Sequence, residues 1–193
     1  MRIISGKFRG LKLESPLDSN TRPTSDRFKE ALFSILEAPK YNLKINVSKV
    51  LDICSGTGSL GIEAISRGAK QVYLIENDPR AIYIIKKNIS KLKIYNHNQV
   101  QIKLIQDDAT KVLERIKKVF DIVFIDPPYH SSIIEKCLIR LKELGLINNH
   151  SYIFAESSKK ESFDLDGYEV FDTKIYGKSK LTVLRLLRSS SIK

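Results

Sequence analysis

From Lys49 onward the chain alternates between short apolar runs and amphipathic stretches, and this alternation limits the fold more than any other feature. Runs typical of buried strands occupy about 50–54, 72–75, 100–105, 120–126 and 152–155. Helical spacing follows Gly58 and recurs at about 79–92, 109–117 and 132–144. Strands that alternate with helices form a parallel sheet covered by helices. The sequence therefore predicts an α/β fold.

Two more strand-like runs close the chain, at about 168–176 and 180–187, with Gly177 in the turn between them. The connection is too short for a parallel crossover, so these two strands are expected to be antiparallel. Residues 46–188 are predicted to form one domain, and the tail 189–193 is predicted to be disordered.

Residues 1–45 have a different character and are predicted to form a small extension. Two apolar runs surround a loop bracketed by Gly6 and Gly10, which predicts a β-hairpin. A helix is expected next, with Thr24 or Ser25 as its cap. Its apolar face is predicted to consist of Phe28, Ala31, Leu32, Ile35 and Leu36.

The chain is strongly basic, with 33 Lys and Arg against 22 Asp and Glu and a net charge of +11. This excess favours a phosphate polymer as partner, although solvated lysine faces would give the same count. No apolar run reaches membrane-spanning length, and Cys54 and Cys137 form neither a zinc motif nor a disulfide framework. We expect a soluble cytoplasmic protein without a metal.

A glycine-rich segment follows the first predicted strand and opens a helix. Gly56, Gly58 and Gly61 form a G-x-G-x-x-G motif, which lets the backbone turn tightly and approach a ligand. Glu76 ends the second strand, where a carboxylate can accept both hydroxyls of a ribose. The pattern fits a dinucleotide or S-adenosylmethionine, because both contain adenosine. Asp107 or Asp108, after the third strand, can accept from an adenine amine or cap a helix.

The fourth strand ends in Asp126-Pro127-Pro128-Tyr129. An exocyclic amine of a nucleobase is a poor nucleophile unless acceptors hold its N–H groups and direct its lone pair. The Asp126 carboxylate and the Pro127 carbonyl are two such acceptors, and the Tyr129 ring can stack on a base. The plain alternative is a loop stiffened by prolines.

These two segments meet if the strands run in the order 3-2-1-4-5, since strands one and four are then neighbours at the switch point. A sulfonium methyl held by the glycine loop would face an amine held by Asp126. A nicotinamide enzyme has no use for this pairing, and His97, His130 and His150 lie in polar loops. S-Adenosylmethionine is the better expectation.

The chain resembles class I S-adenosylmethionine-dependent methyltransferases, and more closely the RsmD family of guanine-N2 methyltransferases of small-subunit (16S) ribosomal RNA. The resemblance spans nearly the whole chain and rests on residues 2–10, 22–27, 30–33, 51–64, 76, 78, 126–129, 156–157 and 176–177. The N-terminal segments are its specific part. One departure is Asp108, where the family can carry an amide.

The resemblance implies a Rossmann-like, seven-stranded, mostly parallel sheet in the order 3-2-1-4-5-7-6, with helices on both faces. It implies methyl transfer from S-adenosylmethionine, with S-adenosylhomocysteine as product, to guanine N2 in an assembled or assembling small subunit. A monomer is expected. The implied cofactor-binding residues are Asp52, Cys54, Gly56, Thr57, Gly58, Gly61, Glu76, Asn77, Asp108 and Ala109.

A guanine in structured RNA must be flipped out of its stack before its N2 can reach Asp126. We assign the RNA contacts to the basic and aromatic residues of the N-terminal segment, which are Lys7, Phe8, Arg9, Arg22 and Arg27.

Three alternatives share parts of this pattern. A DNA amine methylase would need a target-recognition region, and too few residues follow Tyr129 to form one. A methylase of glutamine amides in protein factors would have no use for the basic N-terminal segment. An RNA-binding assembly factor with an idle cofactor fold would not need the intact glycine loop, Glu76 and Asp126.

Overall fold

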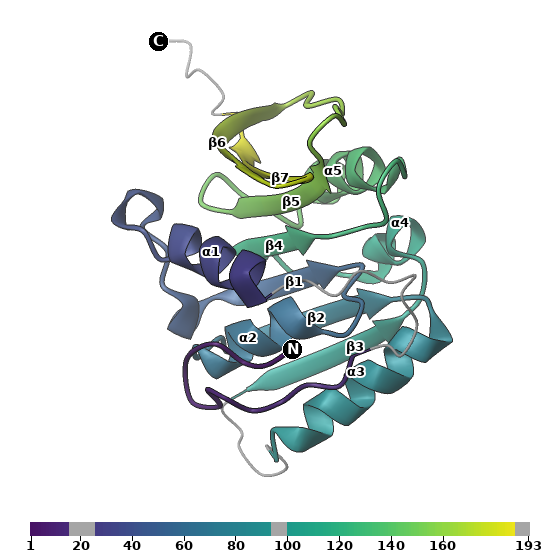
Figure 1. The fold of residues 1–193 in the computed structure, drawn as a ribbon. Helices are drawn as coiled ribbons and strands as arrows, with labels where there is room; N and C mark the ends of the chain where they lie inside the picture. The colour runs from purple at the N-terminus through teal and green to yellow at the C-terminus, as the bar shows by residue number, and fades with distance from the viewer. Residues whose placement is uncertain (16–25, 94–99, 188–193) are drawn as a thin grey trace.

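The structure is a computed structural model that describes residues 1–15, 26–93 and 100–187. Seven strands form one sheet in the order β3-β2-β1-β4-β5-β7-β6, which confirms the predicted topology (Figure 1). The strands are β1 Lys49–Ile53, β2 Gln71–Glu76, β3 Gln101–Gln106, β4 Ile122–Ile125, β5 Tyr152–Ser158, β6 Tyr168–Tyr176 and β7 Ser179–Leu186.

The first five strands are parallel, and β7 pairs antiparallel with both β5 and β6. Strand β1 lies between β2 and β4, so the segments that follow β1 and β4 leave the same edge of the sheet side by side (Figure 1). This is the switch point at which open α/β sheets bind ligands.

Helices cover both faces of the sheet, as predicted (Figure 1). The helices are α1 Asp26–Leu36, α2 Ser59–Ser66, α3 Pro79–Lys91, α4 Ala109–Val112 and α5 Ile133–Glu143, with 3-10 turns at Pro39–Tyr41, Ile45–Val47 and Leu113–Arg115. Alternate strand residues point to opposite faces, so Phe124 packs in the core under α1 and α2 while Val123 packs under α4 and α5.

The helix predicted at 109–117 is shorter than expected. The α-helix ends at Val112, and a 3-10 turn carries the chain to Arg115. The apolar face nevertheless remains buried at Ala109, Val112, Leu113 and Ile116. Two β-branched residues among the first four, Thr110 and Val112, weaken the helix, and burial of the face does not require it to continue.

The predicted N-terminal hairpin is present as a single antiparallel bridge between Arg2 and Lys12 rather than two full strands. Its loop packs against the last turn of α2, where the Lys7 amide donates to the Ser66 carbonyl at 2.7 Å. Gly6 has a φ of +82°, and a Cβ there would lie 1.9 Å from the Ser66 carbonyl oxygen. The loop therefore depends on glycine at this position.

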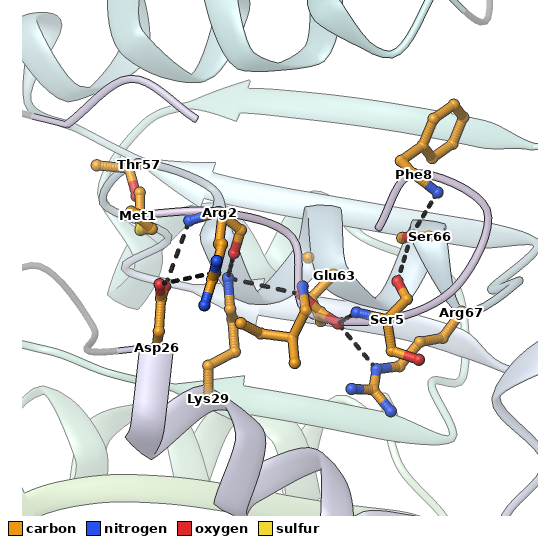
Figure 2. A network of polar contacts seen from close by, with 12 residues as sticks. Met1, Arg2, Ser5, Phe8, Asp26, Lys29, Thr57, Glu63, Ser66 and Arg67 are labelled. Carbon is orange, nitrogen blue, oxygen red and sulfur yellow. Dashed lines mark hydrogen bonds and ion pairs between the residues drawn. The ribbon is translucent and has the colours of Figure 1, made fainter. Parts of the chain in front are cut away.

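A buried ion pair holds this hairpin between α1 and α2 (Figure 2). Lys29 and Glu63 are both fully buried, with Nζ and Oε2 3.5 Å apart. Lys29 also donates to the Arg2 carbonyl at 2.5 Å, and Glu63 accepts from the amides of Ile4 and Ser5. Burial lowers the pKa of Lys29, and the Glu63 carboxylate opposes this shift.

The buried face of α1 is rotated from the predicted one. Lys29 and Phe33 are buried, whereas Ala31 and Ile35 are only partly so. A lysine is a poor candidate for burial from sequence alone, and its partner Glu63 lies 34 positions away. The expected boundary at residue 45 remains a prediction, although Ile3, Leu13 and Phe28 share one core with the sheet.

Among the described residues, no helix has the length and apolar content needed to cross a membrane. The same part of the chain contains no group of three metal-ligating side chains. Arg22, the predicted caps Thr24 and Ser25 and the tail 189–193 lie outside the described residues.

Candidate functional site

A cavity of about 970 Å³ lies at the carboxyl edge of the sheet. Its walls come from the segments that follow β1, β2, β3 and β4, together with β5, the β6–β7 turn and the start of α1. Most predicted site residues line it, namely Arg27, Cys54, Gly56, Thr57, Glu76, Asn77, Asp108, Ala109, Asp126, Pro127, Pro128 and Tyr129. The topology thus brings together segments that are far apart in sequence.

The glycine loop turns with left-handed backbone at two positions. Gly56 has a φ of +55° and Gly58 a φ of +76°, which side chains rarely allow. The Glu76 carboxylate accepts from the Gly56 amide at 2.7 Å and from the amides of Asn77 and Asp78 at 2.9 and 3.0 Å. Glu76 was predicted to accept from the hydroxyls of a ribose. In the structure its carboxylate holds the glycine loop in place.

Asp52, Gly58 and Gly61 do not line the cavity but lie beneath or behind the loop. The Asp52 carboxylate accepts from the Gly61 amide at 2.8 Å. A Cβ on Gly61 would lie 2.3 Å from Leu74 Cδ2, so only glycine lets α2 pack this closely on β2. Burial raises the pKa of Asp52 to about 7, against the opposing effect of the Gly61 amide.

The two acids after β3 have separate partners. Asp108 caps α4, because its carboxylate accepts from the amide and hydroxyl of Thr110 at 2.8 and 2.6 Å. These bonds lower the pKa of Asp108. Asp107 pairs with Arg115 at 3.2 Å. The capping interpretation of Asp108 is therefore confirmed. Both acids also line the cavity, and an adenine contact stays a prediction.

Cys54 lines the cavity directly after β1, with a φ of +58°. Burial raises the pKa of its thiol, which keeps the sulfur neutral near pH 7. A neutral thiol is a weak nucleophile, so Cys54 contributes shape and apolar surface to the wall.

The turn after β4 places its acid at the edge of the sheet. The Asp126 amide donates to the Ile53 carbonyl at 3.3 Å, which continues the β1–β4 pairing by one residue. Pro127 is buried, and the Ser131 hydroxyl donates to the Pro128 carbonyl at 2.7 Å. The Asp126 carboxylate thereby lies beside the glycine loop, as predicted from the strand order.

Tyr129 is fixed by side chains from two other strands. Its hydroxyl donates to Glu156 Oε1 of β5 at 3.3 Å and lies 2.8 Å from Ser179 Oγ of β7. Glu156 and Ser179 are 9% and 2% exposed and line the same cavity. This anchoring fixes the ring plane against which a base can stack.

The sequence analysis missed most of the wall opposite the glycine loop. Phe28 of α1 meets Tyr176 of β6 edge to face, with ring centroids 5.7 Å apart, and exposed Ile175 adjoins them. The family resemblance includes Glu156 and Tyr176 but implies no role for either. An acid one residue beyond the predicted fifth strand was the available signal for Glu156.

The predicted RNA contacts do not all lie near this cavity. Arg27 lines it, whereas Lys7, Phe8 and Arg9 do not. Their loop lies at the C-terminal end of α2, toward the amino ends of the strands (Figures 1 and 2). Met1, from the same segment, instead contacts the glycine loop, with the Thr57 hydroxyl 3.7 Å from its sulfur (Figure 2).

The cavity suits an adenosine-containing cofactor beside a second ligand. Its volume is in the range of small-molecule sites, and its glycine-loop half offers left-handed backbone and the Glu76 carboxylate. Its other half offers an acceptor, a stiff turn and an anchored aromatic ring. The two halves meet where β1 and β4 are paired.

Comparison with protein families shows that residues 1–185 match the model described as Conserved hypothetical protein 95. Ribosomal RNA small subunit methyltransferase D of Buchnera aphidicola from Acyrthosiphon pisum is 38% identical over 161 residues, covering 83% of this chain and 79% of the relative. The protein of that name in Escherichia coli K12 is 35% identical over 157 residues, covering 81% and 74%.

Solved structures are similar over nearly the full length. The yhhF protein of Escherichia coli superposes with a TM-score of 0.80 at 30% identity, covering 96% of this chain and 97% of that one. A hypothetical protein of Thermus thermophilus gives a TM-score of 0.78 at 25% identity, with coverages of 96% and 99%.

Proposed function

Because the chain belongs to the RsmD family, we propose that it methylates the exocyclic N2 amine of a specific guanine in small-subunit (16S) ribosomal RNA. The methyl donor is S-adenosylmethionine, and the substrate is an assembled or assembling small subunit. Relatives named ribosomal RNA small subunit methyltransferase D support the RNA class. The protein acts as a monomer in the cytoplasm.

The glycine-loop half of the cavity is proposed to hold the cofactor. When bound, the cofactor supplies an electrophilic methyl group on sulfur. The backbone of Gly56 and Thr57 approaches it closely, and Glu76 accepts from the ribose while it also holds the Gly56 amide. A carboxylate has about four acceptor positions, so both roles are compatible. Asn77, Asp108 and Ala109 line the adenine side.

The turn after β4 is proposed to hold the amine. Asp126 and the Pro127 carbonyl accept hydrogen bonds from the two N2–H groups. These bonds direct the nitrogen lone pair toward the methyl group. S-Adenosylmethionine bound in the other half would supply the methyl group, and the Asp126 carboxylate would accept the proton that N2 loses and pass it to solvent. Tyr129 stacks on the flipped base, with its ring fixed by Glu156 and Ser179.

The RNA around the target is proposed to contact the basic N-terminal segment. Exposed Arg27 in the cavity wall is placed to meet the nucleotides next to the target. Lys7, Phe8 and Arg9 lie farther away and would meet RNA beyond the immediate flank. Arg22 completes the predicted set. Net charge of +11 favours this partner.

The observation that carries the proposal is the shared cavity of the glycine loop and Asp126-Pro127-Pro128-Tyr129. The test is a comparison of 16S rRNA from cells with and without the protein, by mapping every methylated guanine. We expect one N2-methylguanosine to be present in RNA from cells that have the protein and absent in RNA from cells that lack it. Identical methylation in both samples would refute the proposal, and equilibrium dialysis would then show whether S-adenosylmethionine binds at all.

A further inference from the structure

The base edge that an N2 methyltransferase must recognise differs from that of other amine methyltransferases. In guanine the amine lies between two ring nitrogens, and one of them, N1, carries a hydrogen and donates. In adenine and cytosine the ring nitrogen beside the amine is an acceptor. Once the base is flipped, this edge is available for contact. A second acceptor beside the amine site would therefore select guanine.

The sheet places such an acceptor next to Asp126. Strands β4 and β5 are parallel, and their last registered pair is Ile125 with Ala155. The next residues are Asp126 and Glu156, and both line the cavity. Neighbouring strands lie about 4.8 Å apart, so two acids at the same register position of neighbouring strands can contact adjacent groups on one base edge.

The surroundings of Glu156 fit an acceptor role. The side chain is only 9% exposed, and the Tyr129 hydroxyl donates to its Oε1 at 3.3 Å. The same residue that fixes the stacking ring thus faces the cavity with a carboxylate. A carboxylate has about four acceptor positions, so a bond from N1–H is compatible with the bond from Tyr129.

We infer that Glu156 accepts the N1–H of the target guanine and so determines the choice of base. This inference rests on the proposed guanine-N2 activity and adds the residue that reads the neighbouring ring nitrogen. Asp126 then holds the amine, Glu156 reads N1, and Tyr129 sets the plane in which both contacts are made.

A purely structural role for Glu156 would act through Tyr129 alone. Ser179 shares that role, because its Oγ lies 2.8 Å from the same tyrosine hydroxyl. Ser179→Ala is therefore a matched control that loosens the ring and leaves the Glu156 carboxylate in place. Loss of ring position should slow the methylation of every base to the same degree.

The experiment uses the full chain and small subunits reconstituted with guanine or 2-aminopurine at the target. 2-Aminopurine keeps the N2 amine but has no hydrogen on N1. The wild-type protein should prefer guanine in kcat/KM. Glu156→Gln keeps an oxygen for Tyr129 and adds an N–H that can donate to N1. We expect it to reduce the guanine preference at least tenfold, whereas Ser179→Ala should leave the preference unchanged.

A second variant, Glu156→Asp, guards against misfolding of the first and should retain the guanine preference at a lower rate. An unchanged preference in a folded Glu156→Gln protein would overturn the inference while the proposed function stands. An equal change in Ser179→Ala would also overturn it. A wild-type protein that methylates neither substrate would refute the proposed function itself, and the inference with it.

Discussion

The two halves of the cavity are stabilised in different ways, although they occupy adjacent strands. In the glycine-loop half, Glu76 and Asp52 accept from backbone amides within 20 residues of their own positions. In the amine half, Tyr129 is fixed by Glu156 and Ser179, which come from β5 and β7. The first half is built locally, and the second depends on the completed sheet.

Because of this difference, mutations in the two halves should affect different properties of the protein. A change in the glycine-loop half should alter the loop and the affinity for cofactor, because its acids hold the backbone itself. A change in the amine half should alter the rate, because its side chains face the reacting base in the proposed reaction.

The largest effect is expected from Asp126→Ala. Loss of the acceptor that holds the amine should lower kcat by about 10²–10³-fold, the cost of removing one preorganised electrostatic contact. Affinity for S-adenosylmethionine, measured by titration calorimetry, should stay near the wild-type value. Normal turnover in this variant would refute the proposed mechanism.

Glu76→Ala should show the opposite profile. It removes the proposed ribose acceptor and the bond to the Gly56 amide, so cofactor affinity should weaken by about 1–3 kcal/mol. RNA affinity should be unaffected. Glu76→Gln, which keeps one acceptor oxygen, should fall between the two proteins. Calorimetry that finds cofactor affinity unchanged in Glu76→Ala would show that the assignment is wrong.

Asp52 should make folding stability depend on pH. Its pKa is about 7 in the folded protein and about 3.9 when unfolded, so the unfolded chain binds fewer protons between these values. The free energy of unfolding should therefore fall as pH rises from about 4 to about 7, by at most about 1.4 kcal/mol per pH unit from this group. Urea titrations of Asp52→Asn should show a shallower decrease, and an unchanged one would contradict the assignment.

The smallest effect concerns the RNA contacts. Removing the Arg27 charge should reduce the slope of log affinity against log salt by about one, as expected for one phosphate contact. Removing the charges of Lys7 and Arg9 should lower RNA affinity. Cofactor binding should stay unchanged, because both residues lie outside the cavity. Unchanged affinity and slope in the Lys7, Arg9 and Arg22 triple variant would make these cations a solvated face.

The sequence was sufficient for the fold and for the local half of the site. The short apolar runs located the seven strands, the family resemblance supplied their order, and the Gly56 and Glu76 spacing identified the loop. Buried Lys29 could not be foreseen, because its partner Glu63 lies on another helix. The contacts of Tyr129 with Ser179 and of Phe28 with Tyr176 could not be foreseen either. They arise only from the order of the strands and the position of α1.

The most direct test of the central claim is the position of the transferred methyl group. Small subunits from cells that lack the protein would be incubated with the purified chain and S-adenosylmethionine, and the RNA hydrolysed for nucleoside mass spectrometry. We predict N2-methylguanosine with the wild-type protein and none with Asp126→Ala. A methyl group on ribose, on a ring nitrogen or on adenine N6 would contradict the account.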